Sequence, residues 1–541
     1  MKFLILFGIL FKLSSADFYC DCSNKQTFSA EFNVEWFFAA PDGYIRHVLG
    51  INRQFPAPVI HVCKGDTIKI TVINKIDAPT SIHWHGMFQY GTLTSDGVPG
   101  VTQCAIQPGD YYQYKFHTDY QAGTYWYHSH YSVQYIDGLK GALIIHDPKD
   151  PWISAYEDED ILMLTDWYHT LALDLEAYYL SPASNGTEPI PDTALINGIG
   201  QYNCSLVNKC SYYDTIIQVN TTKRFRIINT SAFAVFVLTI HGHKMRMIEA
   251  DGVNLDGNII VDSLRINAGQ RYSVLVHANE QNPKRNYWIQ ATIDSDVMAS
   301  APVQPTVKAI LRYVDENGCY VSSKKPINSH LNSTDDNLKI LDSIHEGDQF
   351  IDIYSSLVPL DSPVPQQSTK KVLIEIEFYA NDENVNLAHF NNISFLHLMD
   401  TTLLSLTRAQ QPYPQSNNVQ IIQYGDIIDI ILNNHDTGEH PIHLHGHIFW
   451  ILAAGKTNDG DYNSSQVVLN TLNPLARDTA SINPISYMVL RFEANNPGLW
   501  MMHCHIDWHL QAGLALVWAE AAELLHYKYG LSKELDVCAA Y

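Results

Sequence analysis

The sequence has 541 residues, of which 46% are hydrophobic, and this length favours three or four globular domains. Its 57 acidic and 34 basic side chains give a formal net charge of −23. Such an acidic excess argues against nucleic acid and anionic membranes as partners and favours solubility. The charge itself says nothing about the fold.

The first 16 residues have the pattern of a signal peptide. Lys2 precedes an apolar run from Phe3 to Phe11, and small residues lead to a cleavage site after Ala16. The run is too short for a stable membrane anchor, and no later stretch approaches 18 uninterrupted apolar residues. Seven N-x-S/T sequons suit the same compartment. We predict a secreted, extracellular glycoprotein with a signal peptide at residues 1–16 and no membrane anchor.

An internal repeat relates the two ends of the chain. Residues 64–74 read K-G-D-T-I-K-I-T-V-I-N and H-W-H-G follows, while residues 424–434 read Y-G-D-I-I-D-I-I-L-N-N and H-L-H-G follows. In both copies an alternating strand then leads to a second histidine block, at His128 and at His503. A central copy of that strand, A-G-Q-R-Y-S-V-L-V from Ala268, lacks the histidines that should follow. We therefore predict three related domains, of which the middle one has lost its metal ligands.

Alternating strands of five to eight residues, separated by Gly, Pro and Asn turns, run through most of the sequence. This pattern is typical of β-sandwich domains, so we predict an all-β fold. A short amphipathic helix is expected around Leu171 to Tyr179. The predicted domains cover residues 27–148, 155–315 and 370–525, with a linker or long loop at 316–369 and a C-terminal tail at 526–541.

Histidine pairs are the most informative motif. The 25 histidines form six H-x-H patterns, whereas random placement predicts roughly one. Alternate residues of a strand share one face, so both imidazoles of a pair can reach one metal site. Four pairs are candidate ligands: His83 with His85, His128 with His130, His443 with His445, and His503 with His505.

Cys504 lies between the last two of these histidines and is expected to point to the opposite face of its strand. A thiolate with two imidazoles is the donor set of a blue-copper electron-transfer site, and His440 and His509 are candidates to complete it. The eight paired imidazoles suit three coppers better than one zinc ion, which rarely takes more than four ligands. One cysteine is therefore expected to join a mononuclear copper to a three-copper cluster.

These blocks, in this order, resemble the copper-binding segments of the multicopper oxidases, a family that includes laccases, ascorbate oxidases and ferroxidases. The resemblance covers nearly the whole chain after the signal peptide. It implies three cupredoxin-like Greek-key β-sandwich or barrel domains and four coppers, one blue and three in a cluster. It assigns the blue copper to His440, Cys504 and His509, the single cluster copper to His83 and His443, and the cluster pair to His85, His128 and His505 and to His130, His445 and His503.

Three further positions follow from the resemblance. The family's axial position beside the blue copper falls on Leu514, which cannot coordinate, so a higher reduction potential is expected. Asp96 and Asp507 match acidic positions that relay protons or orient ligands near the cluster. An Asp-Gly turn remains the alternative for Asp96, and a solvent-facing carboxylate remains the alternative for Asp507.

Cysteine usage suits an oxidising compartment, because eight cysteines remain once Cys504 is reserved for copper. The resemblance implies a disulfide between Cys104 and Cys538. Cys204 and Cys210 are close enough in sequence for a local loop. Three pairings remain open for the other four, which are Cys20, Cys22, Cys63 and Cys319.

Three kinds of reductant are compatible with the sequence. The stretch P-D-T-A-L-I-N-G resembles a laccase segment in which an Asp, here Asp192, accepts a hydrogen bond from a phenol or aromatic amine. Ferroxidases resemble the chain at N-H-D-T-G-E-H-P, where Asp436 suits Fe(II), and their second carboxylate position falls on Asp166. Ascorbate oxidases share I-N-G-I-G-Q-Y-N-C-S, but their axial Met and stacking Trp are Leu514 and Tyr168 here.

We therefore predict a laccase-type copper oxidoreductase that takes electrons from a small-molecule reductant and passes them to O2. Asp192, Asp96 and Asp507 are its predicted catalytic residues. Fe(II) oxidation and ascorbate oxidation are the alternatives. A non-enzymatic cupredoxin binding protein is disfavoured because it has no use for eight cluster histidines. We expect a monomer with no nucleic-acid partner and no cofactor beyond copper.

Overall fold

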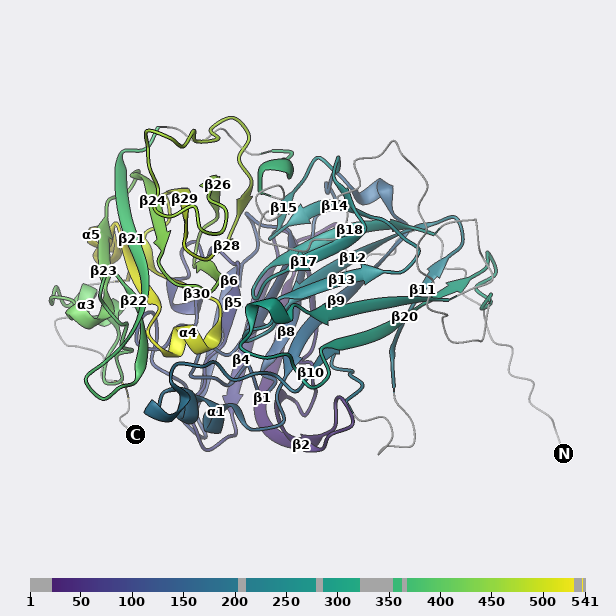
Figure 1. The fold of residues 1–541 in the computed structure, drawn as a ribbon, viewed down its shortest axis with the longest axis horizontal. Helices are drawn as coiled ribbons and strands as arrows, with labels where there is room; N and C mark the ends of the chain where they lie inside the picture. The colour runs from purple at the N-terminus through teal and green to yellow at the C-terminus, as the bar shows by residue number, and fades with distance from the viewer. Residues whose placement is uncertain are drawn as a thin grey trace.

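The computed structural model describes residues 22–202, 211–278, 286–321, 354–361, 367–529 and Cys538. The predicted signal peptide, Cys20, both cysteines of the predicted 204–210 loop and most of the predicted linker lie outside these residues. The described chain folds into six β-sheets, arranged as three successive pairs (Figure 1). The prediction of an all-β fold is confirmed.

The first domain is a sandwich of two four-stranded sheets. Its strands are β1 (Thr27–Ala39), β2 (Arg46–Ile51), β3 (Ile60–Cys63), β4 (Thr67–Asn74), β5 (His83–His85), β6 (Tyr111–His117), β7 (Gly123–His128) and β8 (Lys140–His146). One sheet has the order β2-β1-β4-β6 and the other has the order β3-β8-β7-β5. Ile68, Ile70 and Val72 are buried and alternate with more exposed residues along β4, as expected for a half-buried strand.

The second domain pairs a seven-stranded sheet with a five-stranded sheet. Its strands are β9 (Asp158–Trp167), β10 (Thr193–Ile196), β11 (Tyr213–Gln218), β12 (Thr222–Asn229), β13 (Phe236–Ile240), β14 (Met245–Ala250), β15 (Val253–Asn254), β16 (Ile260–Val261), β17 (Ser263–Ile266), β18 (Arg271–His277), β19 (Tyr287–Ile293) and β20 (Thr306–Val314). The larger sheet has the order β10-β9-β12-β18-β14-β15, with β16 also paired to β14, and the smaller has the order β11-β20-β19-β13-β17.

The third domain pairs a six-stranded sheet with a five-stranded sheet. Its strands are β21 (Lys370–Ala380), β22 (Asn386–Phe390), β23 (Val419–Ile422), β24 (Ile427–Asn434), β25 (His440–Leu444), β26 (Phe449–Ala454), β27 (Ala476–Arg477), β28 (Thr479–Ile482), β29 (Ser486–Glu493), β30 (Gly498–Cys504) and β31 (Ala515–Glu520). The sheet orders are β22-β21-β24-β29-β26-β27 and β23-β31-β30-β25-β28.

The three domains share a strand that ends in asparagine. Asn74 ends β4, Asn229 ends β12 and Asn434 ends β24. Each side-chain amide donates to two backbone carbonyls beyond the end of its strand. These bonds fix the direction of the chain just before the histidine-bearing strand of the first and third domains. The sequence repeat therefore has a structural counterpart, which the middle domain retains.

Helices are few and short in the part of the chain that the structure describes. The α-helices with both ends described are α1 (Ala172–Tyr179), α3 (Leu403–Arg408), α4 (Asp507–Gln511) and α5 (Ala522–Tyr529). Helix α1 coincides with the helix expected from the sequence, and α5 continues from the third predicted domain into the predicted tail. None of the described helices is long and apolar enough to cross a membrane.

Two disulfides connect described cysteines. Cys22 is bonded to Cys63, which settles one of the open pairings. Cys104 is bonded to Cys538, so the first domain is tied to the C-terminal segment, as the resemblance implies. Cys319 is an exposed free thiol.

The domains pack closely against one another. One cluster of buried hydrophobic residues runs through the second and third domains, whereas most of the first domain has a separate core. Strand β5 of the first domain meets strand β25 of the third, since the ring of His85 stacks on that of His443. The first and third domains therefore meet through the strands that carry the H-x-H pairs.

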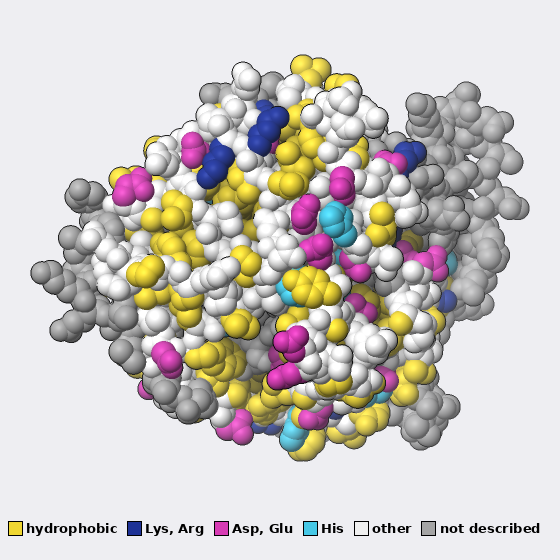
Figure 2. Space-filling view, turned by 60° about the vertical axis from the view of Figure 1, so that its left-hand side comes forward, with side chains coloured by type: hydrophobic (Ala, Val, Ile, Leu, Met, Phe, Trp, Pro, Cys, Tyr) yellow, Lys and Arg dark blue, Asp and Glu magenta, His cyan; other side chains and the backbone are white. Residues whose placement is uncertain are grey.

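The distribution of charge differs between the surface and the interior. Acidic side chains outnumber Lys and Arg on the face shown in Figure 2, in keeping with the net charge of −23. The largest fully buried side chains include four arginines, each paired with a carboxylate: Arg224, Arg226, Arg271 and Arg477. The surface therefore attracts cations, while buried guanidinium groups connect strands and domains.

Candidate metal centres

Cys504 is the last residue of β30, and two histidines converge on its sulfur. His440 begins β25, and His509 lies in helix α4. Their Nδ1 atoms lie 3.7 and 3.5 Å from Sγ and 3.1 Å from each other. All three side chains are buried, as is Leu514, whose carbonyl accepts a bond from the N–H of Cys504 at 3.1 Å. One sulfur and two imidazole nitrogens thus form the donor set of a mononuclear copper site.

The surroundings of Cys504 favour its thiolate. Burial disfavours the charged sulfur, but His509 and His440 outweigh this effect and lower the pKa of the thiol to about 7. Burial likewise opposes charge on His509, whereas Cys504 and Glu188 raise the pKa of this imidazole to about 10. The sulfur is therefore held near the deprotonated form that a metal ion requires.

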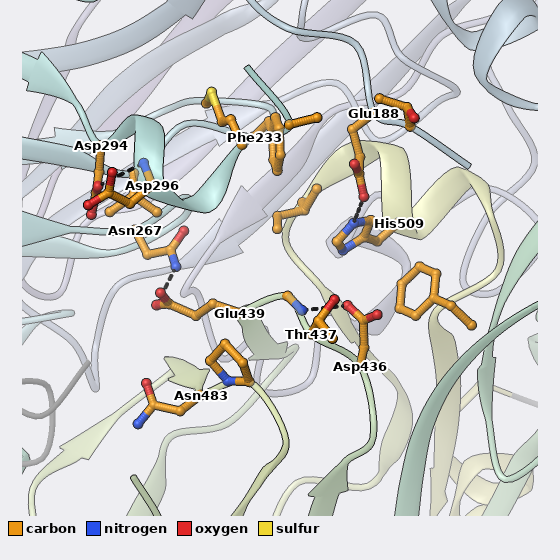
Figure 3. A pocket seen from close by; sticks show the side chains of 18 of the residues that line it. Glu188, Phe233, Asn267, Asp294, Asp296, Asp436, Thr437, Glu439, Asn483 and His509 are labelled. Atoms are coloured by element: carbon orange, nitrogen blue, oxygen red, sulfur yellow. Dashed lines mark hydrogen bonds and ion pairs between the residues drawn. The ribbon is translucent and has the colours of Figure 1, made fainter. Parts of the chain in front are cut away.

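Carboxylates contact the outer edges of both imidazoles. Glu188 Oε1 lies 3.1 Å from Nε2 of His509, and Asp436 Oδ2 lies 3.2 Å from Nε2 of His440. Glu188, Asp436 and His509 line a cavity of about 560 Å³ (Figure 3). In this view the two carboxylates lie on opposite sides of His509. A solute in the cavity therefore meets carboxylates that contact the predicted blue-copper ligands directly.

The four predicted H-x-H pairs lie in paired strands. Strand β5 pairs with β7 so that His83 stands opposite His128, and β25 pairs with β30 so that His443 stands opposite His503. The two ladders face each other across the domain interface, where the ring of His85 stacks on His443 with centroids 3.8 Å apart. Eight imidazoles therefore meet between the first and third domains.

Within this interface the histidines form three groups whose ligand atoms lie within 4.8 Å of one another. Nδ1 of His85 and Nε2 of His505 are 3.1 Å apart, for example, and the Nε2 atoms of His445 and His503 are 3.2 Å apart. The groups are His83, His85 and His443; His85, His128 and His505; and His130, His445 and His503. The last two are the sets that the resemblance implies for the coupled copper pair.

The ring nitrogens suit metal ions better than protons. Backbone carbonyls accept bonds from Nδ1 of four rings, which leaves Nε2 for a metal: His83, His128, His443 and His503. Among the eight cluster histidines, four buried Nε2 atoms have no hydrogen-bond partner among the described residues, those of His83, His128, His130 and His443. Burial lowers the pKa values of His128 and His503 well below the ordinary range, so both are neutral ligands. Unpartnered buried nitrogens are costly, and this donor set fits a copper cluster.

Asp96 and Asp507 are both buried beside these histidines. The carboxylate of Asp96 accepts a bond from Nδ1 of His445 at 3.0 Å, and its backbone carbonyl accepts one from His83 at 2.7 Å. Asp507 lines a small cavity together with His130, and burial raises the pKa of its carboxyl well above the ordinary value. Asp96 therefore does more than begin a turn, and Asp507 does not face solvent.

A third carboxylate, that of Asp478, lies at the cluster, and no sequence motif marks it. Asp478 Oδ1 lies 3.2 Å from Nε2 of His85 and 3.5 Å from Nδ1 of His443. Arg271, from the second domain, donates to both oxygens of Asp478 at 2.6 and 2.7 Å. Asp478 lies outside every H-x-H block. The one related feature of the sequence is the central repeat, whose A-G-Q-R segment contains Arg271, the partner of Asp478.

Asp192 and Asp166, the carboxylates predicted to contact a phenol or Fe(II), do not line the cavity beside His509. Asp192 accepts a bond from the backbone N–H of His169 at 2.8 Å and is not among the residues that line the cavity beside His509. The structure therefore does not bring it to the predicted blue-copper site. Asp166 is fully buried and accepts bonds from three backbone N–H groups, so the second carboxylate that contacts a predicted blue-copper histidine is Glu188 and not Asp166. No motif marked Glu188.

Comparisons with known proteins agree with this arrangement. Three family profiles, each described as multicopper oxidase, match residues 33–150, 158–316 and 379–523. The iron transport multicopper oxidases FET5 of Saccharomyces cerevisiae and fetC of Epichloe festucae are 33% and 36% identical to the chain; each match covers 95% of this chain and 83% and 80% of the relative. Laccase-1 of Cryptococcus neoformans var. neoformans is 34% identical to the chain, and the match covers 92% of this chain and 80% of the laccase.

Solved structures share the fold. The structure of Fet3p, "a multicopper oxidase that functions in iron import", matches with a TM-score of 0.80 and 31% identity. The match covers 95% of this chain and 97% of the Fet3p chain. The structure of the laccase from Botrytis aclada has a TM-score of 0.77 and 30% identity and covers 93% and 89%. The histidine groups are consistent with four coppers, one mononuclear and three clustered. The chain therefore belongs to the multicopper oxidase family and is a copper-dependent oxidoreductase with O2 as acceptor.

Proposed function

We propose that this multicopper oxidase oxidises Fe(II) at the cavity beside His509. The observation that carries the proposal is the pair Glu188 and Asp436, two cavity carboxylates that contact the outer nitrogens of the predicted blue-copper histidines. Carboxylate oxygens are ligands that suit a hard cation such as Fe(II). The iron transport oxidases among the relatives support the same reductant.

The charge of the cavity favours a cation. Burial alone would raise the pKa values of Glu188 and Asp436, but contacts with the histidines outweigh burial and lower both. Both carboxylates are therefore negative at neutral pH. The lining also contains three more acidic residues, Asp294, Asp296 and Glu439, with one guanidinium group, that of Arg265. This acidic excess raises the local concentration of cations.

Bonded residues connect the cavity to the cluster. Glu188 and Asp436 contact Nε2 of the two imidazoles, and Nδ1 of the same rings lies beside Sγ of Cys504. The backbone of Cys504 continues directly into His503 and His505, whose rings belong to the cluster groups. When bound, copper supplies the one-electron redox chemistry, and reduction of O2 to water takes four electrons. A mononuclear site that accepts electrons one at a time, joined to a cluster that receives them, meets that requirement.

O2 reduction also consumes protons, and the buried carboxyls have distinct positions for this task. Burial raises the pKa of Asp507 and so favours its protonated form, and the residue lines the same small cavity as His128 and His130. Asp96 is bonded to His445. We assign proton donation to Asp507 and ligand orientation to Asp96.

Phenol oxidation of the laccase type is the competing function. The predicted phenol acceptor, Asp192, lies outside the cavity, which removes its expected contact with the substrate. The cavity nevertheless presents apolar side chains, among them Phe233, Val235 and Met298, that can pack against an aromatic ring. Phenols are therefore expected to react independently of the two carboxylates.

Substitution of the two carboxylates tests the proposal. In Glu188→Gln and Asp436→Asn we expect kcat/KM for Fe(II) to fall by roughly 10- to 150-fold per site, because a bond to a charged group contributes about 1.5–3 kcal/mol. The value for a dimethoxyphenol should change little. Steady-state kinetics on the copper-loaded enzymes measure both substrates.

The matched control is Asp192→Asn, which changes a partly exposed carboxylate outside the cavity. It should leave Fe(II) oxidation unchanged. Wild-type Fe(II) kinetics in a variant that carries both Glu188→Gln and Asp436→Asn would overturn the proposal. Loss of phenol turnover in Asp192→Asn would favour the laccase function instead. Copper content and blue absorbance of each variant separate loss of the substrate site from damage to the copper site.

A further inference from the structure

A second group of metal-type ligands lies between the first and second domains. His61 is in β3, His146 ends the neighbouring parallel strand β8, and Glu159 is in β9 of the second domain. One ligand atom of each lies within 4.8 Å of the others. Nδ1 of His61 and Nε2 of His146 are 3.1 Å apart, and the two rings are inclined by only 13°. These residues belong to neither the H-x-H blocks nor the cavity beside His509.

The separation of the two nitrogens matches the separations inside the predicted copper centres. The facing nitrogens of His440 and His509 are 3.1 Å apart, and those of His445 and His503 are 3.2 Å apart. Nitrogens at this separation can both reach one cation at the usual Zn–N distance of about 2.0–2.1 Å, with an angle of roughly 100° between them. That angle is close to tetrahedral.

Glu159 adds a second feature of metal sites. Its Oε1 atom lies 3.8 Å from Nδ1 of His146, the ring nitrogen that does not face His61. A carboxylate behind a metal-binding imidazole orients the ring and raises its basicity. The other oxygen of Glu159 accepts bonds from Arg226 at 2.9 and 3.1 Å, so the carboxylate is itself held in place.

Protonation and charge at this position also suit a cation. Burial lowers the pKa of His61 to about 4 and that of His146 to about 3, so both rings are neutral at physiological pH. The half-buried ring of His61 connects the site to solvent. The adjoining ion-pair network has one more carboxylate than guanidinium groups: it consists of Asp150, Glu159 and Glu249 with Arg224 and Arg226.

We propose that His61 and His146, supported by Glu159, bind one divalent transition-metal cation of the zinc(II) type that ties the first domain to the second. Neutral imidazole nitrogens are donors that zinc(II) accepts readily. The site shares no residue with the oxidase centres. Its cation is therefore structural, and turnover does not require it.

Equilibrium dialysis of the fully copper-loaded enzyme against zinc(II), followed by metal analysis, tests this site. The wild type should retain one zinc per chain in addition to its coppers, and His61→Gln and His146→Gln should retain none. Zinc should also raise the melting temperature of the wild type but not of the variants, since a ligand of the folded state stabilises it. The matched control is His117→Gln, which removes an exposed histidine bonded to Thr67 and should keep the zinc.

Two results would overturn the proposal: a wild type without stoichiometric zinc, or zinc retained by both site variants. In either case the 3.1 Å contact is only a hydrogen bond between two imidazoles. His61 is half-buried, so His61→Gln is expected to fold even if the buried change at His146 prevents folding. Unchanged blue absorbance and oxidase turnover serve as the check of folding.

Discussion

Changing Cys504 to Ser is expected to abolish the blue absorbance and the turnover of every reductant, while three of the four coppers remain bound. The sulfur is the soft donor that defines a blue-copper site, and a serine hydroxyl keeps its proton at neutral pH. The eight cluster imidazoles form their own groups without the sulfur, so they should still bind metal. Absorbance, copper analysis and O2 uptake with Fe(II) or a phenol measure the three effects.

Cys319→Ser is the control for this change, because Cys319 is the other free thiol of the described chain and is exposed. It should retain four coppers, the blue absorbance and full turnover. A Cys504→Ser protein that stays blue would contradict the assignment of the sulfur. A Cys504→Ser protein that binds no copper at all would contradict the independence of the cluster.

The ligand sets could be predicted from the sequence because their information is local. In H-x-H, the period of a strand alone puts both imidazoles on one face. The repeat of the asparagine-ended strand then places such pairs in equivalent positions of two domains, at His83 and at His443. Only the contact between the two ladders had to come from tertiary structure.

The carboxylates were harder to predict because their partners are distant in sequence. Glu188 contacts His509 across 321 residues, and Asp478 contacts His85 across 393 residues. Asp192 immediately precedes strand β10, and the sequence of that strand does not determine which cavity the preceding side chain reaches. Resemblance over a short segment therefore does not fix the position of this carboxylate relative to the cavity.

The contribution of the middle domain was also not predicted from the sequence. This domain has lost its metal ligands, yet its side chains contact residues beside the cluster histidines. Its Arg271 holds Asp478 of the third domain, and its Asp251 in turn accepts bonds from Arg477 at 2.9 and 3.1 Å. Gly86 makes this approach possible: a Cβ there would lie 2.6 Å from the guanidinium of Arg271 and 2.8 Å from Asp478. The second domain thus helps to position two cluster histidines that belong to the other two domains.

Arg271→Met should therefore lower the free energy of unfolding by about 3–5 kcal/mol, the usual cost of leaving one partner of a buried ion pair without its counter-charge. It should also alter the paramagnetic resonance signal of the cluster copper held by His83 and His443, because the Asp478 carboxylate is then no longer fixed beside His443. The control is Arg491→Met, which breaks a buried pair with Asp429 inside the third domain at 2.5 and 2.9 Å. It should be destabilised to a similar degree with an unaltered copper signal. An unaltered signal in both variants would reduce Arg271 to a link between domains with no influence on the cluster.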